Sequence, residues 1–391
     1  MITVFKNVTV ITPWEQKGAV VVVKDGVIAG VHSRCDILEG AEVIDGGGRF
    51  LSSGFMDIHV HGGGGHSVMS CDAEEIRKMA EAHAEYGTTS IVPTTLASPI
   101  PVLEKAVDAV KAAQETCTKS NILGVHLEGP FLAQSQRGAQ SPDSILVPAE
   151  HNYIPLLERW DGIRMMGAAP ETEGALALGR ELEKRGIVAS VAHSDATYDQ
   201  VLAAVENGFR DVTHIYSGCS LMKRVNGYRV AGVVEAGLTL DELTVQVIGD
   251  LRHLPVSLIR LIYRCKGADK IALITDGLEY SASTLEEGTT YVQENGVATV
   301  YEDGVMKLMD RTAFAGSVAT MSRLVKNMYH HAGISLNDAV RMATLTPASI
   351  LGLAGKKGRV AAGYDADLIL YGDDVEPYFV MVGGRIIKNT L

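Results

Sequence analysis

The first 50 residues of the chain and its long middle section differ in their hydrophobic pattern. Residues 1 to 50 consist of short stretches in which apolar and polar residues alternate, such as ITVFKNVTVI and GAVVVVKDG, separated by Gly, Asp and Asn. Alternation with a period of two is typical of half-buried β-strands, and the separating residues are typical of turns. The first segment therefore predicts a small antiparallel sheet.

From Gly54 to about Asn327, short apolar runs alternate with segments of helical period, such as AEEIRKMAEAHAEYG. Strands that alternate with helices form parallel sheets with helical crossovers. The eight candidate strands are FMDIHV, TSIVPT, NILGVHLE, IRMMGAA, IVASVAH, DVTH, LTVQVIG and KIALITD. Because eight such units close a barrel, we predict an α/β fold of the (β/α)₈ TIM type.

Turn-rich β patterns return near the end of the chain, in KGRVAAGYDADLILYG and YFVMVGGRIIKN. Strand patterns at both ends predict a small discontinuous β-sandwich that is built from the two termini and packs on the barrel. The predicted division is residues 1–52 and 350–391 for the two parts of the sandwich, and 53–349 for a catalytic barrel.

The composition excludes some functions. The 391 residues are 46% hydrophobic and 21% charged, and the formal net charge of −12 argues against nucleic acids and anionic membrane surfaces as partners. The start of the chain lacks a leader pattern, no apolar run approaches the length of a membrane span, and the five cysteines include no CxxC pair. We expect a cytoplasmic protein, and any anionic substrate would need a local basic patch.

The candidate chemistry lies at strand ends. In GFMDIHVHGGGGH, His59 and His61 point to the same side of an extended strand, and the glycines allow the backbone to turn and approach whatever the histidines hold. Four more ionisable residues end other predicted strands: Glu128, His193, His214 and Asp276. Active sites of these barrels are built at the carboxyl ends of the strands. We therefore predict that the six side chains meet there.

These residue types indicate a metal centre. Imidazole nitrogens and carboxylate oxygens are suitable ligands for Zn²⁺ or Fe²⁺, and a carboxylate can bridge two ions. A catalytic metal lowers the pKa of its water and polarises a carbonyl group. We assign Asp276 as the group that takes the proton of the water and passes it to a leaving amine. His126 shares a strand face with Glu128 but lies two residues deeper, where we expect a hydrogen-bonded supporting role.

Several motifs resemble those of the N-acetylglucosamine-6-phosphate deacetylases, within the amidohydrolase superfamily, over essentially the whole chain. GFMDIHVHG is similar to the first metal-binding strand of that family, and HLEGPF to its glutamate motif. AHSDAT and THIY resemble its two later histidine strands, and LITDG its catalytic aspartate. FAGS, TPASILGL and KGRVAAGYDADLIL are similar to its closing segments.

The resemblance implies that Glu128, His193 and His214 bind one metal ion, and that His59 and His61, with Glu128 as a bridge, bind a second in members that keep both histidines. It implies Asp276 as the acid and base. It also implies a set of residues that contact the substrate: Ala139 and Gln140; Ser217 and Gly218, in the loop after His214; and Arg229, His253, Phe314, Ala315 and Gly316. In the family, the counterpart of Arg229 can come from the neighbouring subunit, which implies a homodimer.

The chain departs from the family pattern in the pocket. Ser217, Gly218 and Cys219 replace the usual Asn-Ala-Met, and Asp250 to His253 reads Asp-Leu-Arg-His in place of Asp-Gly-x-His. Lys223, Arg224 and Arg229 lie in a stretch, residues 212 to 234, that contains no acidic residue. This stretch is either a solvated surface or a seat for an anion, and Arg252 and His253 are placed to join such a seat.

The implied reaction is hydrolysis of the N-acetyl amide of an N-acetylhexosamine 6-phosphate, most simply the gluco form, to the amine and acetate. Related alternatives are the galacto epimer, an unphosphorylated N-acyl sugar or a cyclic amide. Cyclic-amide relatives typically bridge their metals with a carboxylated lysine, whereas this chain has Glu128 on a middle strand. A barrel that serves only as a scaffold would be free to lose ligands, but every expected ligand is present.

Overall fold

A parallel barrel forms the centre of the molecule. The computed structural model describes residues 1–34, 40–292, 298–312, 314 and 316–391. Adjacent strands pair in parallel in the order β6 (Phe55–Val60), β9 (Thr88–Thr95), β11 (Val125–Glu128), β12 (Ile163–Ala168), β13 (Val188–Val191), β14 (Phe209–Val212), β17 (Thr244–Ile248) and β18 (Ile271–Ile274), and β10 (Asn121–Ile122) extends the sheet beside β9. Each barrel strand overlaps one of the eight predicted runs, so the predicted (β/α)₈ fold is confirmed.

The last and first barrel strands meet at their carboxyl ends. The backbone N–H of Asp276 donates to the carbonyl of His59 at 2.9 Å, and that of His61 donates to the carbonyl of Gly277 at 2.8 Å. Deeper in the seam, the hydroxyl of Thr275 donates to the buried Asp57 carboxylate at 2.5 Å. This side-chain hydrogen bond thus connects β6 and β18 where their backbones form no ladder of hydrogen bonds. Burial raises the pKa of Asp57 to about 7.

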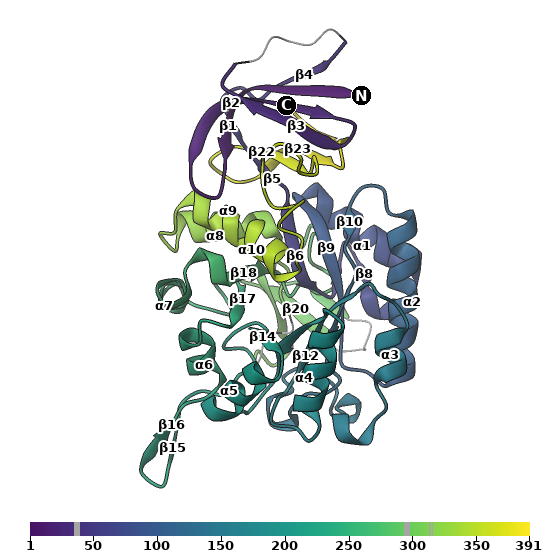
Figure 1. The fold of residues 1–391 in the computed structure, drawn as a ribbon, viewed down its shortest axis with the longest axis vertical. Helices are drawn as coiled ribbons and strands as arrows, with labels where there is room; N and C mark the ends of the chain where they lie inside the picture. Colours follow the sequence, from purple (N-terminus) through teal and green to yellow (C-terminus); the bar gives the residue numbers. More distant parts are fainter. Residues whose placement is uncertain (35–39, 293–297, 313, 315) are drawn as a thin grey trace.

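Amphipathic helices cover the outside of the barrel (Figure 1). The helix α1 (Ala73–Glu85) begins where the side chain of Asp72 accepts from the N–H groups of Glu74 and Glu75, and it buries Ile76, Met79 and other apolar residues. The remaining helices are α2 (Ile100–Thr116), α3 (Ile154–Glu158), α4 (Ala175–Lys184), α5 (Tyr198–Glu206), α6 (Val233–Thr239), α7 (Val256–Lys266), α8 (Met321–His330), α9 (Leu336–Met342) and α10 (Leu345–Ile350). No helix in the described ranges is long and apolar enough to cross a bilayer.

The two termini share one sheet, which sits at one end of the molecule in Figure 1. Its strands are β1 (Ile2–Ile11), β2 (Gln16–Lys24), β3 (Val27–His32), β4 (Glu42–Asp45), β5 (Phe50–Ser53), β22 (Leu368–Tyr371), β23 (Pro377–Val382) and β24 (Arg385–Asn389). The order is β24-β23-β22-β5-β1-β2-β3, with β4 also beside β1. The two ends also share a core, in which the rings of Phe5 and Phe379 lie 5.4 Å apart.

One detail of this sheet was predicted wrongly. The first segment was expected to be an antiparallel sheet. The strands β1, β2 and β3 pair antiparallel as expected, but β1 also pairs in parallel with β4 and β5. Alternation of apolar and polar residues reports which face of a strand is buried, and it carries no information about the direction of the neighbouring strand. The predicted boundaries near residues 52 and 350 remain predictions.

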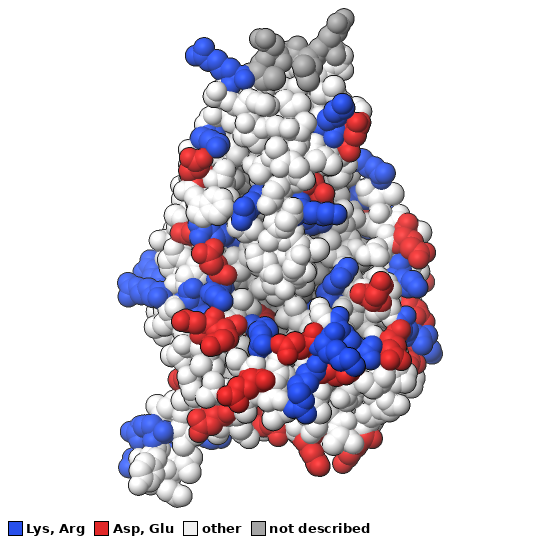
Figure 2. All heavy atoms as spheres, in the orientation of Figure 1, with Lys and Arg blue, Asp and Glu red and all other residues white. Residues whose placement is uncertain are grey.

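Two small β elements were absent from the prediction. A hairpin of β15 (Lys223–Val225) and β16 (Tyr228–Val230) projects from the body of the barrel, with Arg224 directly opposite Arg229 (Figure 1). Basic side chains, in blue, are visible along this projection in Figure 2. A three-stranded sheet of β19 (Thr290–Val292), β20 (Ala298–Glu302) and β21 (Val305–Leu308) follows the last barrel strand. Both elements lie in segments that connect barrel strands to their following helices.

Candidate active site

The two histidines of the first barrel strand lie side by side at the barrel mouth. His59 lies in β6 and His61 follows it, and their Nε2 atoms are 3.2 Å apart. Both side chains are buried, with exposed fractions of 0% and 4%. The alternation of an extended strand places the two rings on the same side, as the sequence predicts.

The glycines after this strand allow the backbone to approach other groups closely, but these groups differ from the ones expected from the sequence. A Cβ on Gly62 would lie 2.6 Å from the backbone nitrogen of Glu279, and one on Gly63 would lie 2.3 Å from Nε2 of His83. The imidazole of His83 donates to the carbonyl of Gly62 at 2.9 Å. The glycines therefore allow β7 (Gly62–Gly63) to pack against helix α1 and the loop after β18, and they do not face the ligand atoms.

Glu128, at the end of β11, lies at the centre of the cluster. Its Oε1 atom is 2.9 Å from Nε2 of His214 and 3.1 Å from Nε2 of His193, and its Oε2 atom is 3.4 Å from Nε2 of His61. The carboxylate thus has one oxygen on each side of the site, which is the arrangement that a bridging ligand needs. Asp276 completes the cluster, with its Oδ1 atom 3.1 Å from Nε2 of His61.

The outer nitrogen of each imidazole is hydrogen bonded to an oxygen. Nδ1 of His61, His193 and His214 lies 2.8 to 3.0 Å from the backbone carbonyls of Thr94, Gln136 and Ser217, respectively. Nδ1 of His59 lies 2.9 Å from Oε1 of Gln246. Because a carbonyl oxygen only accepts, each Nδ1 carries the proton, and each Nε2 presents a lone pair to the site.

This arrangement fits a metal ion. Four nitrogen lone pairs and two carboxylates converge. Without a cation between them, these electron-rich groups would repel one another. Two overlapping sets each place ligand atoms within 4.8 Å of one another: His59, Glu128 and His214, and His59, His61 and Asp276. Nitrogen and carboxylate oxygen donors of this kind are typical of Zn²⁺ and Fe²⁺ sites. The histidines hydrogen bond outward, as metal-bound histidines almost always do.

The electrostatics of the cluster also favour a cation. Burial disfavours the charged form of His214, yet its hydrogen bond to Glu128 and the nearby carboxylates raise its pKa to about 9, so the lone pair of this Nε2 takes up either a proton or a metal ion. Burial alone would raise the pKa of Glu128, but the surrounding histidines hold it well below its usual range. The neighbouring histidines likewise hold the pKa of Asp276 below its usual range. Both carboxylates therefore remain ionised at neutral pH and attract positive charge into the site.

Three residues of the cluster have an unusual backbone conformation. The φ angles of His193, His214 and Asp276 are 44°, 25° and 48°, in the left-handed region that non-glycine residues rarely adopt. Each residue directly follows or lies just beyond a barrel strand, where the chain turns away from the barrel axis. Strain of this kind is maintained only where the surroundings over-determine the conformation, and it is common at functional sites.

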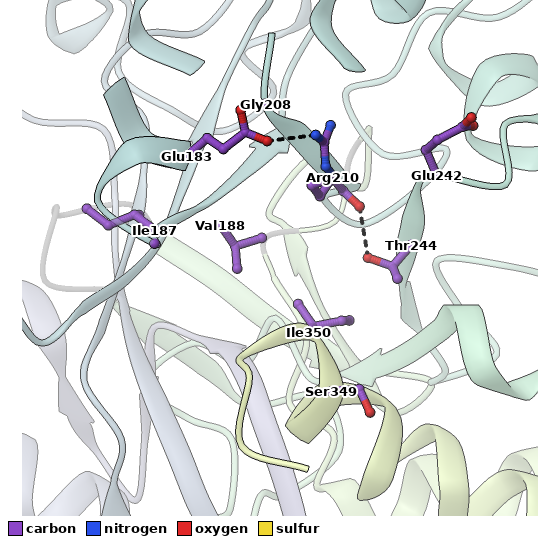
Figure 3. A pocket seen from close by; sticks show the side chains of 10 residues that line it. Glu183, Ile187, Val188, Gly208, Arg210, Glu242, Thr244, Ser349 and Ile350 are labelled. Carbon is purple, nitrogen blue, oxygen red and sulfur yellow. Dashed lines mark hydrogen bonds and ion pairs between the residues drawn. The ribbon is translucent and has the colours of Figure 1, made fainter. Parts of the chain in front are cut away.

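A cavity of about 500 Å³ opens over the cluster. Its lining includes His61, Glu128, His193, His214 and Asp276, together with apolar side chains such as Met69, Leu96 and Leu308. A second cavity, of about 330 Å³, lies at the opposite end of the barrel strands, where Arg210 pairs with Glu183 at 2.7 Å (Figure 3). None of the six clustered residues lines that second cavity, so the larger one is the candidate active site.

Most of the predicted substrate residues line the larger cavity: Ala139, Gln140, Ser217, Gly218, His253, Phe314 and Gly316. Ala315 lies outside the described residues. Gln140 also supports the cluster, because its amide donates to Oε2 of Glu128 at 2.7 Å. His253 is held by Asp250, whose carboxylate accepts from its Nδ1 at 2.7 Å. These contacts do not test a role in substrate binding, which stays a prediction.

Two predicted cationic residues lie away from the cavity of their own chain. The guanidinium of Arg252 donates to the carbonyl of Asp303 at 2.6 Å, in the turn between β20 and β21. Arg229 is exposed on the projecting hairpin. Of the described residues that line the cavity, none is Lys or Arg. Within one chain, therefore, Arg229, Arg252 and His253 do not come together at the cavity to form the expected anion-binding group.

Comparison with known proteins identifies the family. Residues 50–387 match the model of the amidohydrolase family. The chain belongs to this family. It is 31% identical to an N-acetylglucosamine-6-phosphate deacetylase of Vibrio furnissii, over 96% of this chain and 92% of that protein. It is 30% identical to an N-acetylgalactosamine-6-phosphate deacetylase of Shewanella sp. (strain ANA-3), over 87% and 84%. The crystal structure of N-acetylglucosamine-6-phosphate deacetylase from Pasteurella multocida superposes with a TM-score of 0.90, at 28% identity and full coverage of both chains.

Some residues of this amidohydrolase site were not predicted from the sequence. Glu279 and Leu278 line the cavity, just after Asp276. Gln246 and Asp211 support His59 from inside the barrel. A signal for this second pair was available, because each is a polar residue inside a predicted barrel strand, LTVQVIG and DVTH. A buried polar residue in such a strand needs a partner, and here the partner belongs to the site.

Proposed function

We propose that this amidohydrolase removes the acetyl group from an N-acetylhexosamine 6-phosphate, with N-acetylglucosamine 6-phosphate as the first candidate. The products are acetate and the hexosamine 6-phosphate. The observation that carries the proposal is the cluster of four Nε2 lone pairs and two carboxylates under a 500 Å³ cavity, in a chain whose full-length relatives are named for this reaction.

We assign Glu128, His193 and His214 as ligands of one divalent metal ion, Zn²⁺ or Fe²⁺. His59 and His61, with Glu128 as the bridge, are assigned to a second ion. The metal would supply Lewis acidity, which polarises the amide carbonyl and acidifies water. The protein holds the ligands ready for this, because the outward hydrogen bonds of the imidazoles fix which nitrogen faces the site.

Asp276 is proposed as the group that moves the proton. Its carboxylate lies beside His61 and borders the cavity, so it can contact both the cluster and a bound substrate. It would accept a proton from the attacking water and donate it to the amide nitrogen as the C–N bond breaks, since an amine leaves readily only when protonated.

A second candidate substrate is the galacto epimer. The specific support is the Shewanella relative, which is named for N-acetylgalactosamine 6-phosphate and is as similar to this chain as the relatives named for the gluco form. Ser217 and Gly218 line the cavity where the family has a larger polar side chain, which leaves more room in this loop. Cyclic amides are less favoured, because Glu128 occupies the bridging position.

We further propose that the protein acts as a homodimer in the cytoplasm. Because none of the described cavity-lining residues is Lys or Arg, the cavity wall of the same chain offers the substrate phosphate no permanent positive charge. The hairpin that carries Lys223, Arg224 and Arg229 projects away from its own barrel, and its Tyr228 is 78% exposed. Such a projection can reach the cavity of a second subunit and bring Arg229 to the phosphate.

The test is a release assay for acetate. It uses N-acetylglucosamine 6-phosphate, its galacto epimer and both unphosphorylated sugars, before chelation, after chelation, and after addition of Zn²⁺ or Fe²⁺. We expect release from a phosphorylated sugar that disappears with chelation and returns with metal. Equal turnover of phosphorylated and free sugars would overturn the phosphate assignment, and undiminished activity in metal-free protein would overturn the metal assignment.

A further inference from the structure

The side chain of Gln246 lies inside the barrel, between the metal-binding cluster and a buried carboxylate. It comes from β17 and is fully buried. Its Oε1 atom lies 2.9 Å from Nδ1 of His59, and its Nε2 atom lies 2.7 Å from Oδ2 of Asp211. One amide group thus joins the two residues, accepting from His59 and donating to Asp211.

Among the four imidazoles of the cluster, His59 has a different kind of support. Nδ1 of His61, His193 and His214 contacts backbone carbonyls, which accept hydrogen bonds and never donate. Nδ1 of His59 contacts an amide, which accepts in one orientation and donates in the other. The fold therefore determines the tautomer of three histidines directly, whereas the tautomer of His59 depends on which way Gln246 is turned.

Asp211 determines the orientation of that amide. Its carboxylate accepts from Ser190 at 2.8 Å and from Thr244 at 2.5 Å, in addition to Gln246. Thr244 is the first residue of β17, at the end of that strand that borders the second cavity (Figure 3). Surrounded by donors, the carboxylate accepts the amide N–H, so the oxygen of Gln246 faces His59. If the amide were reversed, its N–H₂ would face Nδ1, and the proton of His59 would move to Nε2, the atom that faces the cluster.

We propose that Gln246, oriented by Asp211, is a positioning residue that holds His59 in the Nδ1–H tautomer and so keeps its Nε2 lone pair available to a metal ion. This inference rests on the metal centre of the proposed function. It assigns a specific task to two residues that contact neither the cavity nor the metal ligand atoms. Outer hydrogen bonds of this kind typically change metal affinity by roughly ten- to a hundredfold when they are removed.

Three variants separate this role from simple packing. Gln246→Leu removes the acceptor. Asp211→Asn combined with Gln246→Glu exchanges the two functional groups, so that Glu accepts from both His59 and the new amide. Gln114→Leu is the control, because Gln114 is a partly buried amide that donates to the backbone carbonyl of Ile122, away from the cluster.

The first measurement is metal affinity, by competition with a chelator and elemental analysis. We expect Gln246→Leu to weaken the ion that needs His59 by roughly ten- to a hundredfold, while the ion at Glu128, His193 and His214 is retained. The exchanged double variant should restore the affinity, and Gln114→Leu should not change it. A loss in Gln246→Leu that the double variant fails to restore would indicate a packing role and overturn the inference.

The second measurement is the position of the proton on His59, read from ¹⁵N chemical shifts of histidine-labelled protein, with the signals assigned by their absence in His59→Gln. We expect Nδ1–H in the wild type and in the double variant, and loss of this preference in Gln246→Leu. A proton on Nε2 in the wild type would overturn the inference whether or not metal is bound. Wild-type protein that binds no metal would instead overturn the proposed function.

Discussion

The Oδ1 atom of Asp276 lies 3.1 Å from Nε2 of His61, yet the two side chains differ in exposure, at 19% and 4%. Both side chains line the cavity, and Asp276 is the more exposed member of the pair. A group that exchanges protons with water and with a leaving amine needs this position, since it must touch both the cluster and the substrate.

Replacing Asp276 by Asn should reduce kcat by roughly 10²-fold or more while leaving most of the metal bound, because an amide neither accepts the proton of water nor returns it to the amine. Acetate release and metal content, measured on the same preparation, check this. Wild-type kcat in Asp276→Asn would remove the residue from the proposed role.

The pH profile of the wild type gives a related prediction. Burial favours the neutral form of Asp276, but the neighbouring histidines outweigh it and lower the pKa. The carboxylate is the active form, so activity should persist down to the usual aspartate pKa of about 3.9 and fall only below it, unless metal is lost first. Metal content, followed across the same pH range, distinguishes the two causes. An acid limb near neutral pH with the metal retained would contradict the lowered pKa.

Glu128→Gln should lose both metal and turnover. Oε1 of Glu128 lies within 3.1 Å of Nε2 of both His193 and His214, while Oε2 faces His61. An amide offers one acceptor oxygen and no charge, so it is a poor bridge and removes one of the two negative charges that attract a cation into the site. Elemental analysis checks the metal. Gln140→Leu is a partial control, because it removes the hydrogen bond to Oε2, together with the one that Gln140 accepts from Ala97, and leaves the carboxylate of Glu128 in place. A full complement of metal in Glu128→Gln would contradict the assignment.

The barrel and the members of its cluster could be predicted because both follow from local pattern. Apolar runs separated by helical segments predicted the strands, and the carboxyl ends of parallel strands meet at one edge, which placed His59 and Glu128 together before any contact was known. The parallel pairing of β1 with β4 and β5 could not be predicted, because alternation is the same in parallel and antiparallel pairs.

The surroundings of the cluster were less accessible to sequence reasoning. The contact of Gln246 with His59 joins positions 187 residues apart, and no local pattern reports such a pairing. Arg252 follows a strand end, as a pocket residue would, but the turn at Asp303 offers its guanidinium a carbonyl acceptor outside the cavity. Position along the chain predicted which edge of the barrel these residues occupy, while the side-chain partners depended on loops whose course the pattern does not determine.

Lys357 should make the stability of the protein sensitive to alkaline pH. Its ammonium lies 2.6 Å from Asp367 and 2.9 Å from Asp365, and Asp367 also accepts from Asn121 of the barrel. Burial disfavours the charged lysine, but the two carboxylates outweigh it and raise its pKa. A raised pKa means that the stabilisation is fully present below the unfolded value of about 10.4 and is lost above it.

Lys357→Met should accordingly lower the free energy of unfolding by about 3 kcal/mol at pH 7, since it leaves the buried carboxylate of Asp367 and the partly exposed carboxylate of Asp365 without their partner. The loss of stability between pH 9 and 11 should be smaller in the variant than in the wild type. Chemical denaturation at several pH values checks both statements. Lys388→Met, which removes a partly buried lysine whose ammonium donates to the carbonyl of Glu85, is the control. Equal stability of Lys357→Met and the wild type would contradict the prediction.

Arg229 gives the last prediction, which concerns the phosphate and the second subunit. A charge-assisted hydrogen bond contributes about 1.5 to 3 kcal/mol, so the wild type should prefer the 6-phosphate over the free sugar by at least about tenfold in kcat/KM. Arg229→Ala should remove most of that preference. Arg224→Ala is the matched control, because Arg224 lies directly opposite Arg229 on the same hairpin.

Whether Arg229 acts across the dimer can be decided by mixing two defective chains. An Asp276→Asn chain keeps its arginine and an Arg229→Ala chain keeps its aspartate. If the hairpin serves the cavity of the partner subunit, a mixed dimer contains one site with Asp276 from one chain and Arg229 from the other, and phosphate-selective acetate release should exceed that of either variant alone. If each hairpin serves its own cavity, the Arg229→Ala subunit keeps its defect and mixing restores nothing, which would contradict the proposed exchange between subunits.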